Sequence, residues 1–90
     1  MTNKTIIVTG ATDGIGLEAA TKIAALGNRV GLVGRNPQKG AKAIERIRSV
    51  TGNDKLDFFQ ADLSLISDIN QLSRDIKNKY SELNVLLNNA

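Results

Sequence analysis

Three glycines stand close together near the start of the chain, in residues 9–16, which read TGATDGIG. Gly10 can make a tight turn, Gly14 lets a phosphate approach the backbone because it has no Cβ, and Gly16 permits close contact between neighbouring elements. A helix that begins here would add free N–H groups and a partial positive charge, which suit an anionic pyrophosphate. Glycines in a loop also serve as plain turns, so the role of this segment depends on the elements on either side.

The segments that flank the glycines have the patterns of a strand and a helix. Residues 5–9 are a short β-branched run that stops at a glycine, as buried strands do. Residues 14–26 are rich in alanine and are followed by a glycine, which is a helix stop signal. The apolar residues of this predicted helix recur at helical spacing, at Ile15, Ala19, Ile23 and Leu26. A glycine loop between a strand and a helix favours phosphate binding over a plain turn.

The alternation of strand and helix continues along the chain. We predict a strand at residues 29–33, a helix at 37–50 that Asn36 caps, a strand at 56–60, a helix at 65–80 and a strand at 84–87. The apolar faces of the two later helices hold Ala43, Ile44, Ile47, Ile69, Leu72, Ile76 and Tyr80. The order βαβαβαβ with short connections predicts an α/β fold, a Rossmann-like doubly wound parallel sheet, in one domain over residues 1–90.

The composition excludes several kinds of site. The chain has 90 residues with no cysteine and no histidine, so it has no disulfide, no metal site of the usual zinc type and no Ser-His-Asp triad. No apolar run approaches the length of a membrane span, and the N-terminus lacks a signal-peptide core. We therefore expect a soluble protein of the cytoplasm.

The charge is unevenly distributed along the chain. The net charge is +3, with +5 in residues 1–48 and −2 in residues 49–90. A basic half suits nucleic acid, a membrane surface or a phosphorylated small molecule, and it is also the pattern of a solvated lysine-rich surface. The aromatic residues are only Phe58, Phe59 and Tyr80, too few for a base-stacking platform. We therefore expect no nucleic-acid partner.

The glycine spacing resembles the T-G-x-x-x-G-I/L-G signature of the short-chain dehydrogenase/reductase family. Two further segments agree with that family. Asp62-Leu63 follows the third predicted strand, where the family has an acid beside the adenine, and Asn88-Asn89-Ala90 follows the fourth, where the family has N-N-A-G. The matches lie in the family's order along all 90 residues. The resemblance implies strand order 3-2-1-4 and hydride transfer between a nicotinamide and a carbonyl or alcohol substrate.

The resemblance also implies which cofactor is bound. NAD-preferring members have Asp or Glu at the end of the second strand, where this chain has Gly34 followed by Arg35. A guanidinium matches a phosphate bidentately, so the sequence is similar to the NADP-preferring pattern, with Asn36 and Lys39 near enough to assist. The alternative is that Arg35 is a solvated loop residue. Asp13 departs from the pattern, because some NADP-binding members have a basic residue there.

The remaining cofactor contacts are also implied by the family. Asp62 would accept a hydrogen bond from the adenine amino group and the Leu63 N–H would meet a ring nitrogen; alternatively, Asp62 caps the next helix. Residues 88–90 would contact the ribose through their backbone, and a hydrogen bond of Thr9 would tie the first strand to them; alternatively, Asn88 and Asn89 form an ordinary turn. The implied cofactor-binding set is Gly10, Thr12, Asp13, Gly14, Ile15, Gly16, Arg35, Asn36, Asp62, Leu63, Asn88 and Ala90.

The family's catalytic motif is absent from these residues. The family's acid is the tyrosine of Y-x-x-x-K, whereas the single tyrosine here, Tyr80, is followed four residues later by Asn84 and lies on the apolar face of its helix. We expect the N-terminal part of an NADP-dependent reductase, with no catalytic residue and no activity by itself, whose substrate is bound only by the full-length protein. The alternatives are a complete, non-catalytic dinucleotide-binding or regulatory module and, last, a nucleic-acid-binding protein.

The final predicted strand would lie at the edge of the sheet. An apolar edge with unpaired N–H and C=O groups is a template for another chain, and the helices that cover it in the family are missing. We therefore expect the 90-residue chain alone to be marginally stable and to self-associate.

Overall fold

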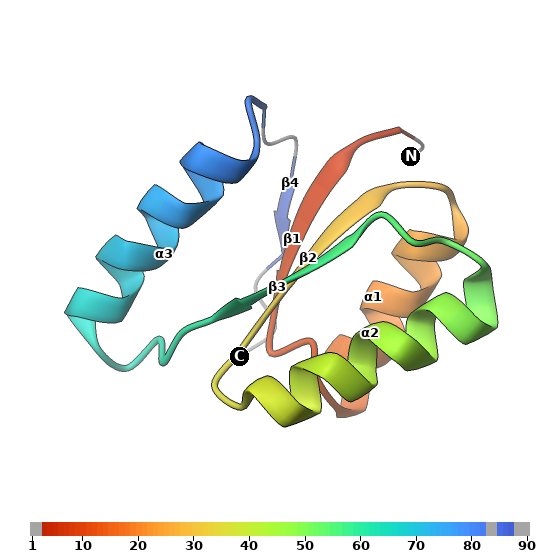
Figure 1. Ribbon diagram of the computed structural model, residues 1–90, viewed down its shortest axis with the longest axis horizontal. Helices are drawn as coiled ribbons and strands as arrows, with labels where there is room; N and C mark the ends of the chain where they lie inside the picture. The colour runs from red at the N-terminus through yellow and green to blue at the C-terminus, as the bar shows by residue number, and fades with distance from the viewer. Residues whose placement is uncertain (1–2, 83–84, 88–90) are drawn as a thin grey trace.

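The computed structural model describes residues 3–82 and 85–87, the latter through their backbone. Strands and helices alternate along these residues (Figure 1). The elements are β1 (Thr5–Thr9), α1 (Gly14–Ala25), β2 (Arg29–Gly34), α2 (Pro37–Thr51), β3 (Leu56–Gln60), α3 (Ile66–Lys79) and β4 (Val85–Leu87). The βαβαβαβ order is as the sequence predicted, with bounds that differ by one residue at several ends.

The four strands form one parallel sheet in the order β3-β2-β1-β4. β1 pairs with β2 from Thr5 opposite Arg29 onward and with β4 from Ile6 opposite Val85 onward. The α/β class with a doubly wound parallel sheet is therefore confirmed, and the strand order is the one that the family resemblance implied. Because the strands are parallel, the loops that follow β1, β2 and β3 leave the sheet at the same edge, where ligands of such folds bind.

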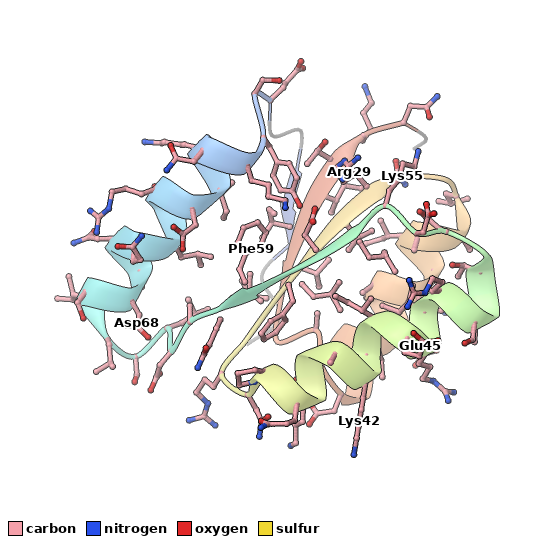
Figure 2. The ribbon with its side chains drawn as sticks, viewed as in Figure 1. Arg29, Lys42, Glu45, Lys55, Phe59 and Asp68 are labelled. Carbon is pink, nitrogen blue, oxygen red and sulfur yellow. The ribbon has the colours of Figure 1, made fainter. Side chains whose placement is uncertain are left out.

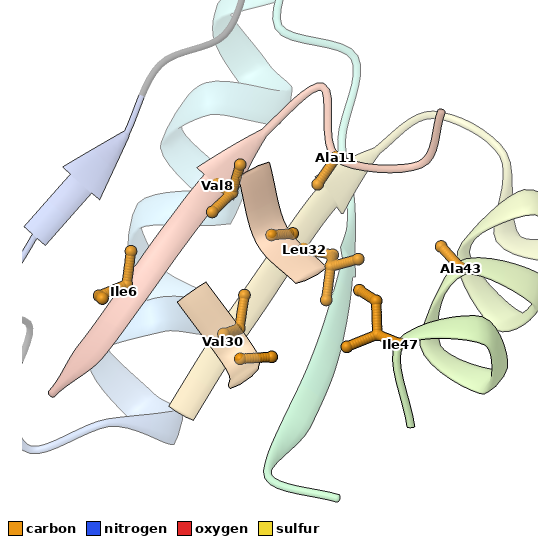
Figure 3. Close-up of a cluster of buried hydrophobic side chains, with 9 residues drawn as sticks. Ile6, Val8, Ala11, Val30, Leu32, Ala43 and Ile47 are labelled. Atoms are coloured by element: carbon orange, nitrogen blue, oxygen red, sulfur yellow. The ribbon is translucent and has the colours of Figure 1, made fainter. Parts of the chain in front are cut away.

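One face of the sheet is covered by α1 and α2 (Figure 1). Ile6 and Val8 of β1 and Val30 and Leu32 of β2 point toward these helices and are fully buried. Figure 3 shows how they meet Ile47 and the small side chains of the helices. Burial of each large aliphatic side chain is worth about 1.5–3 kcal/mol, so this cluster fixes α2, and with it the start of α2 at the ligand-binding edge.

The opposite face is covered by α3 (Figure 1). Ile7, Val33 and Phe59 come from the strands, with Phe59 between β3 and α3 in Figure 2, and Leu72 and Tyr80 come from the helix side. The Tyr80 and Phe59 rings pack edge to face, with centroids 5.9 Å apart. The packing role that the sequence predicted for Tyr80 is thus confirmed.

The buried face of α1 differs from the one that its large apolar residues suggested. Gly16, Ala20 and Ala24 are buried against the sheet, whereas Ile15 and Leu26 are 76% and 52% exposed. The fully buried positions of the helix are of glycine and alanine size, which lets it lie close to the sheet, and Leu17 and Ile23 pack against the same core from partly buried positions. Ile69 of α3 is similarly 44% exposed, although its neighbours Leu72 and Tyr80 on the predicted apolar face are buried.

Among the described residues, no helix is both long and apolar enough to cross a lipid bilayer.

Candidate functional site

A cavity of about 440 Å³ lies at the carboxyl edge of the sheet, between the loops that follow β1, β2 and β3 and the first turn of α2. It gathers side chains and backbone from segments as far apart as residues 9 and 64. Seven of the residues that the sequence predicted as cofactor contacts line it: Gly10, Thr12, Asp13, Arg35, Asn36, Asp62 and Leu63.

The glycine loop owes its shape to backbone conformations that favour glycine. Gly10 has φ 63° and Gly14 has φ 58°, both in the left-handed region. The Gly10 N–H donates to the carbonyl of Val33 over 3.1 Å, which ties the loop to the end of β2. The loop therefore turns sharply out of β1 and stays beside the second strand.

The first turn of α1 follows this loop directly. Asp13 is the N-cap residue with an extended backbone, and its side chain makes no capping hydrogen bond. Gly14 and Ile15 are exposed, Gly16 is buried against the sheet, and none of the three lines the cavity itself. The start of α1 thus presents backbone N–H groups and the positive end of the helix dipole beside the cavity, as an anion would require.

The end of β2 is crowded at Gly34. A Cβ there would lie 2.8 Å from Cγ2 of Thr12, so the threonine would have to shift. Arg35 follows on the exposed rim of the cavity and makes no ion pair within the described residues. The strand therefore ends in a crowded glycine followed by an exposed guanidinium.

The start of α2 forms the next part of the wall. Asn36 is the N-cap, as predicted, and its Oδ1 accepts hydrogen bonds from the backbone N–H groups of Gln38 and Lys39 over 2.9 and 3.2 Å. Because that oxygen already serves the helix, Asn36 shapes the loop rather than offering its side-chain oxygen to a ligand. Lys39 reaches across the cavity, and its Nζ lies 3.4 Å from Oδ2 of Asp13.

The third part of the wall is the loop after β3. Asp62 Oδ1 accepts hydrogen bonds from Ser64 N and Oγ, over 3.0 and 2.6 Å. These bonds, with a smaller contribution from the charge of Arg35, hold the pKa of Asp62 below its usual range, so the carboxylate is ionised at neutral pH. The Asp62 N–H donates to Asp68 Oδ2, which fixes the loop onto α3 (Figure 2). The N-cap of α3 is Leu65, so the alternative role of Asp62 as the cap of that helix is wrong.

A second hollow, of about 500 Å³, lies at the opposite edge of the sheet among residues that include Lys4, Arg29 and Tyr80. Asp57 lies beside it and binds Arg29, Lys79 and the Tyr80 hydroxyl. Burial, and then the hydrogen bond to Asp57, raise the pKa of Tyr80 far above its usual value. No glycine loop opens onto this hollow, and its tyrosine is a buried structural group.

The two remaining predicted contacts, Asn88 and Ala90, lie outside the described residues, as do Asn89 and the predicted hydrogen bond between this segment and Thr9. The sequence reasoning left Ser64 out of the site. Its signal was present in the Asp-Leu-Ser pattern, since a side chain of Asp commonly binds the backbone two residues onward. Lys39 was predicted only as an assistant to Arg35, whereas the structure places its ammonium in an ion pair across the cavity.

The chain is similar to known oxidoreductases along nearly its whole length. The family model described as short chain dehydrogenase matches residues 4–90. The human polyprenol dehydrogenase is 40% identical over 98% of this chain and 27% of its own length. Retinol dehydrogenase 11 of Mus musculus is 39% identical over 97% of this chain and 28% of its own length. The chain therefore spans little more than a quarter of the curated relatives that it matches.

Solved structures give the same result for the fold. A short chain dehydrogenase of Escherichia coli complexed with NADPH matches with a TM-score of 0.90 and 38% identity, over 100% of this chain and 38% of the other. An actinorhodin polyketide ketoreductase with NADPH matches with a TM-score of 0.87 and 30% identity, over 100% of this chain and 35% of the other. With the family match, the parallel sheet and the glycine loop in agreement, the chain belongs to the short-chain dehydrogenase family.

Proposed function

We propose that the protein is an NADP-dependent oxidoreductase that transfers a hydride between nicotinamide and a carbonyl or alcohol, and that these residues hold the adenine half of the cofactor. The observation that carries this proposal is the pairing of Gly34 with Arg35 at the end of β2. Thr12 crowds Gly34 and so disfavours an Asp or Glu side chain there, whose carboxylate would repel a 2′-phosphate. Arg35, the next residue, supplies a cation on the cavity rim.

We assign the groups of NADP(H) to residues at the cavity and beside it. The start of α1 and the glycine loop would hold the pyrophosphate, because they offer N–H groups and a positive dipole end. Arg35 would bind the 2′-phosphate, and Asp62, ionised and adjacent to Leu63, would accept a hydrogen bond from the adenine amino group. The bound nicotinamide would supply or accept the hydride. Two structural neighbours complexed with NADPH support this choice of cofactor.

NADP⁺ is expected to stabilise the protein more than NAD⁺ does at the same concentration. A ligand that binds only the folded state at about a hundred times its Kd adds about 2.7 kcal/mol, which shifts the melting temperature of a domain this size by roughly ten degrees or more. Thermal melts with NADP⁺, NAD⁺ and nicotinamide mononucleotide as the control measure this. An equal or larger shift with NAD⁺ would show that the 2′-phosphate is not recognised.

Residues 1–90 by themselves are expected to show no turnover. The family's Tyr-x-x-x-Lys motif does not occur in them, and Tyr80 is buried at the other edge of the sheet with a raised pKa, so it is not a proton donor at the cavity. NADPH oxidation with a panel of ketones, aldehydes and quinones measures the activity. Turnover above the background of the same protein without substrate would mean that a proton donor has been overlooked.

A non-catalytic dinucleotide-binding module is the second candidate. It is supported by the same cavity, since seven of the predicted adenine-side contacts line it and residues 1–90 contain no Tyr-x-x-x-Lys motif. The two functions differ in one assay. A longer protein that contains these residues and a downstream Tyr-x-x-x-Lys oxidises NADPH if the first proposal holds, whereas a module only binds it.

A further inference from the structure

The cavity contains an ion pair that a phosphate-binding site does not need. Oδ2 of Asp13, at the end of the glycine loop, lies 3.4 Å from Nζ of Lys39 on α2. Asp13 is the N-cap residue of α1, yet its carboxylate makes no capping hydrogen bond. The carboxylate therefore forms an ion pair with Lys39 across the cavity, and the N-terminus of α1 has no side-chain cap.

The ion pair changes how many cations at the cavity are available to a phosphate. The lining holds two cations, Arg35 and Lys39, and two anions, Asp13 and Asp62. Arg35 makes no ion pair within the described residues, whereas Lys39 is held by Asp13. A phosphate monoester carries a charge of about −1.5 to −2 and would attract both cations. To bind it, Lys39 has to leave Asp13 or share its charge between two anions.

We propose that Asp13 is a specificity-determining residue, which lowers the affinity for the 2′-phosphate by competing with it for Lys39. This inference rests on the proposed NADP-binding function. In this proposal Arg35 is the main group that attracts the 2′-phosphate, and the Asp13–Lys39 ion pair weakens the contribution of Lys39. The protein then discriminates less strongly between NADP(H) and NAD(H) than a site with two free cations would.

The size of the effect follows from the exposure of the pair. The side chains of Lys39 and Asp13 are 59% and 74% exposed. Exposed ion pairs contribute about 0.2–1 kcal/mol, so releasing Lys39 should raise the affinity for a 2′-phosphate by roughly 1.5- to fivefold. ADP-ribose lacks that phosphate, and its affinity should change less.

The test compares two ligands that carry only the adenine half, ADP-ribose and 2′-phospho-ADP-ribose, by calorimetric titration. Asp13→Asn removes the carboxylate charge, Lys39→Gln removes its partner, and the double variant removes both. Glu18→Gln is the matched control, because Glu18 is an acid on the same helix that pairs with Lys22 away from the cavity.

We expect Asp13→Asn to raise the ratio of the two affinities in favour of the phosphorylated ligand, and we expect this gain to vanish when Lys39→Gln is also present. Glu18→Gln should leave the ratio unchanged. A gain that persists in the Lys39→Gln background would mean that Asp13 repels the phosphate directly, and an unchanged ratio would mean that the pair is only a surface contact; either result overturns the inference. If the unaltered protein binds neither ligand, the proposed cofactor function itself fails. The experiment therefore distinguishes a failure of the cofactor function from a failure of the inference about Asp13.

Discussion

Replacing Arg35 by alanine is expected to lower the affinity for NADPH by roughly ten- to a hundredfold and to leave the affinity for NADH nearly unchanged. A charge-assisted hydrogen bond to phosphate contributes about 1.5–3 kcal/mol, and NADH has no phosphate at that position. Arg35 is exposed on the cavity rim, so its removal should not disturb the fold. Fluorescence titration of the two reduced cofactors measures both affinities.

The matched control for this variant is Arg46→Ala. Arg46 is exposed on α2 and does not line the cavity, so the substitution removes the same charge without touching the site. Its effect on NADPH affinity should be small and should fall further with added salt, because only long-range attraction is lost. If Arg35→Ala leaves the ratio of NADPH to NADH affinity unchanged, another group selects the cofactor.

Replacing Ile47 by alanine is expected to cost about 2–5 kcal/mol of unfolding free energy. Ile47 is fully buried where α2 packs on β2 and β3 (Figure 3), and alanine would leave a cavity that the sheet cannot fill. Native proteins of this kind are stable by only roughly 5–15 kcal/mol, so the loss is large. It would also loosen α2, whose first turn carries Asn36 and Lys39 at the candidate site. Urea unfolding measures the difference.

Val50→Ala on the same helix is the control for the core variant. Val50 is 62% exposed, so its truncation should change the unfolding free energy by less than about 0.5 kcal/mol. If Ile47→Ala and Val50→Ala cost the same, α2 is not packed on the sheet as described.

The order of the elements could be predicted because each has a local signal. β1 and β2 are short runs of β-branched and apolar residues that end at glycines, and α2 begins at Asn36-Pro37, where an amide side chain caps the free N–H groups. These signals act within a few residues, so the sequence alone carries them. The cavity's location then follows from topology, since parallel strands bring their carboxyl ends together.

The face that α1 buries could not be read from its large apolar residues. Of the four residues in the predicted pattern, Ile15 and Leu26 are exposed and Ala19 and Ile23 are half-buried. The fully buried positions are instead Gly16, Ala20 and Ala24. The residues that α1 covers, Ile6 and Val8 of β1 and Val30 and Leu32 of β2, meet it only in the folded sheet. The pattern therefore predicts the helix, and tertiary packing decides which of its apolar residues are buried.

Parts of the candidate site depend on contacts between distant residues in the same way. Asp13 and Lys39 are separated by 26 residues, and nothing in either local sequence indicates that they pair. Thr12 limits the space at Gly34 only because the glycine loop is tied to the end of β2 through Val33. The sequence indicates which charged residues are present, and the fold determines which of them form ion pairs.

The most direct test of the cofactor site is an NMR titration of the isotope-labelled protein with NADP⁺. The proposed site predicts chemical-shift changes at the backbone amides of Gly10, Gly14, Arg35, Lys39 and Leu63, and a difference between NADP⁺ and NAD⁺ concentrated at residues 34–39. Changes confined to Lys4, Arg29 and Tyr80 would place the ligand in the hollow at the opposite edge of the sheet, and would contradict the assignment of the cofactor to the glycine loop.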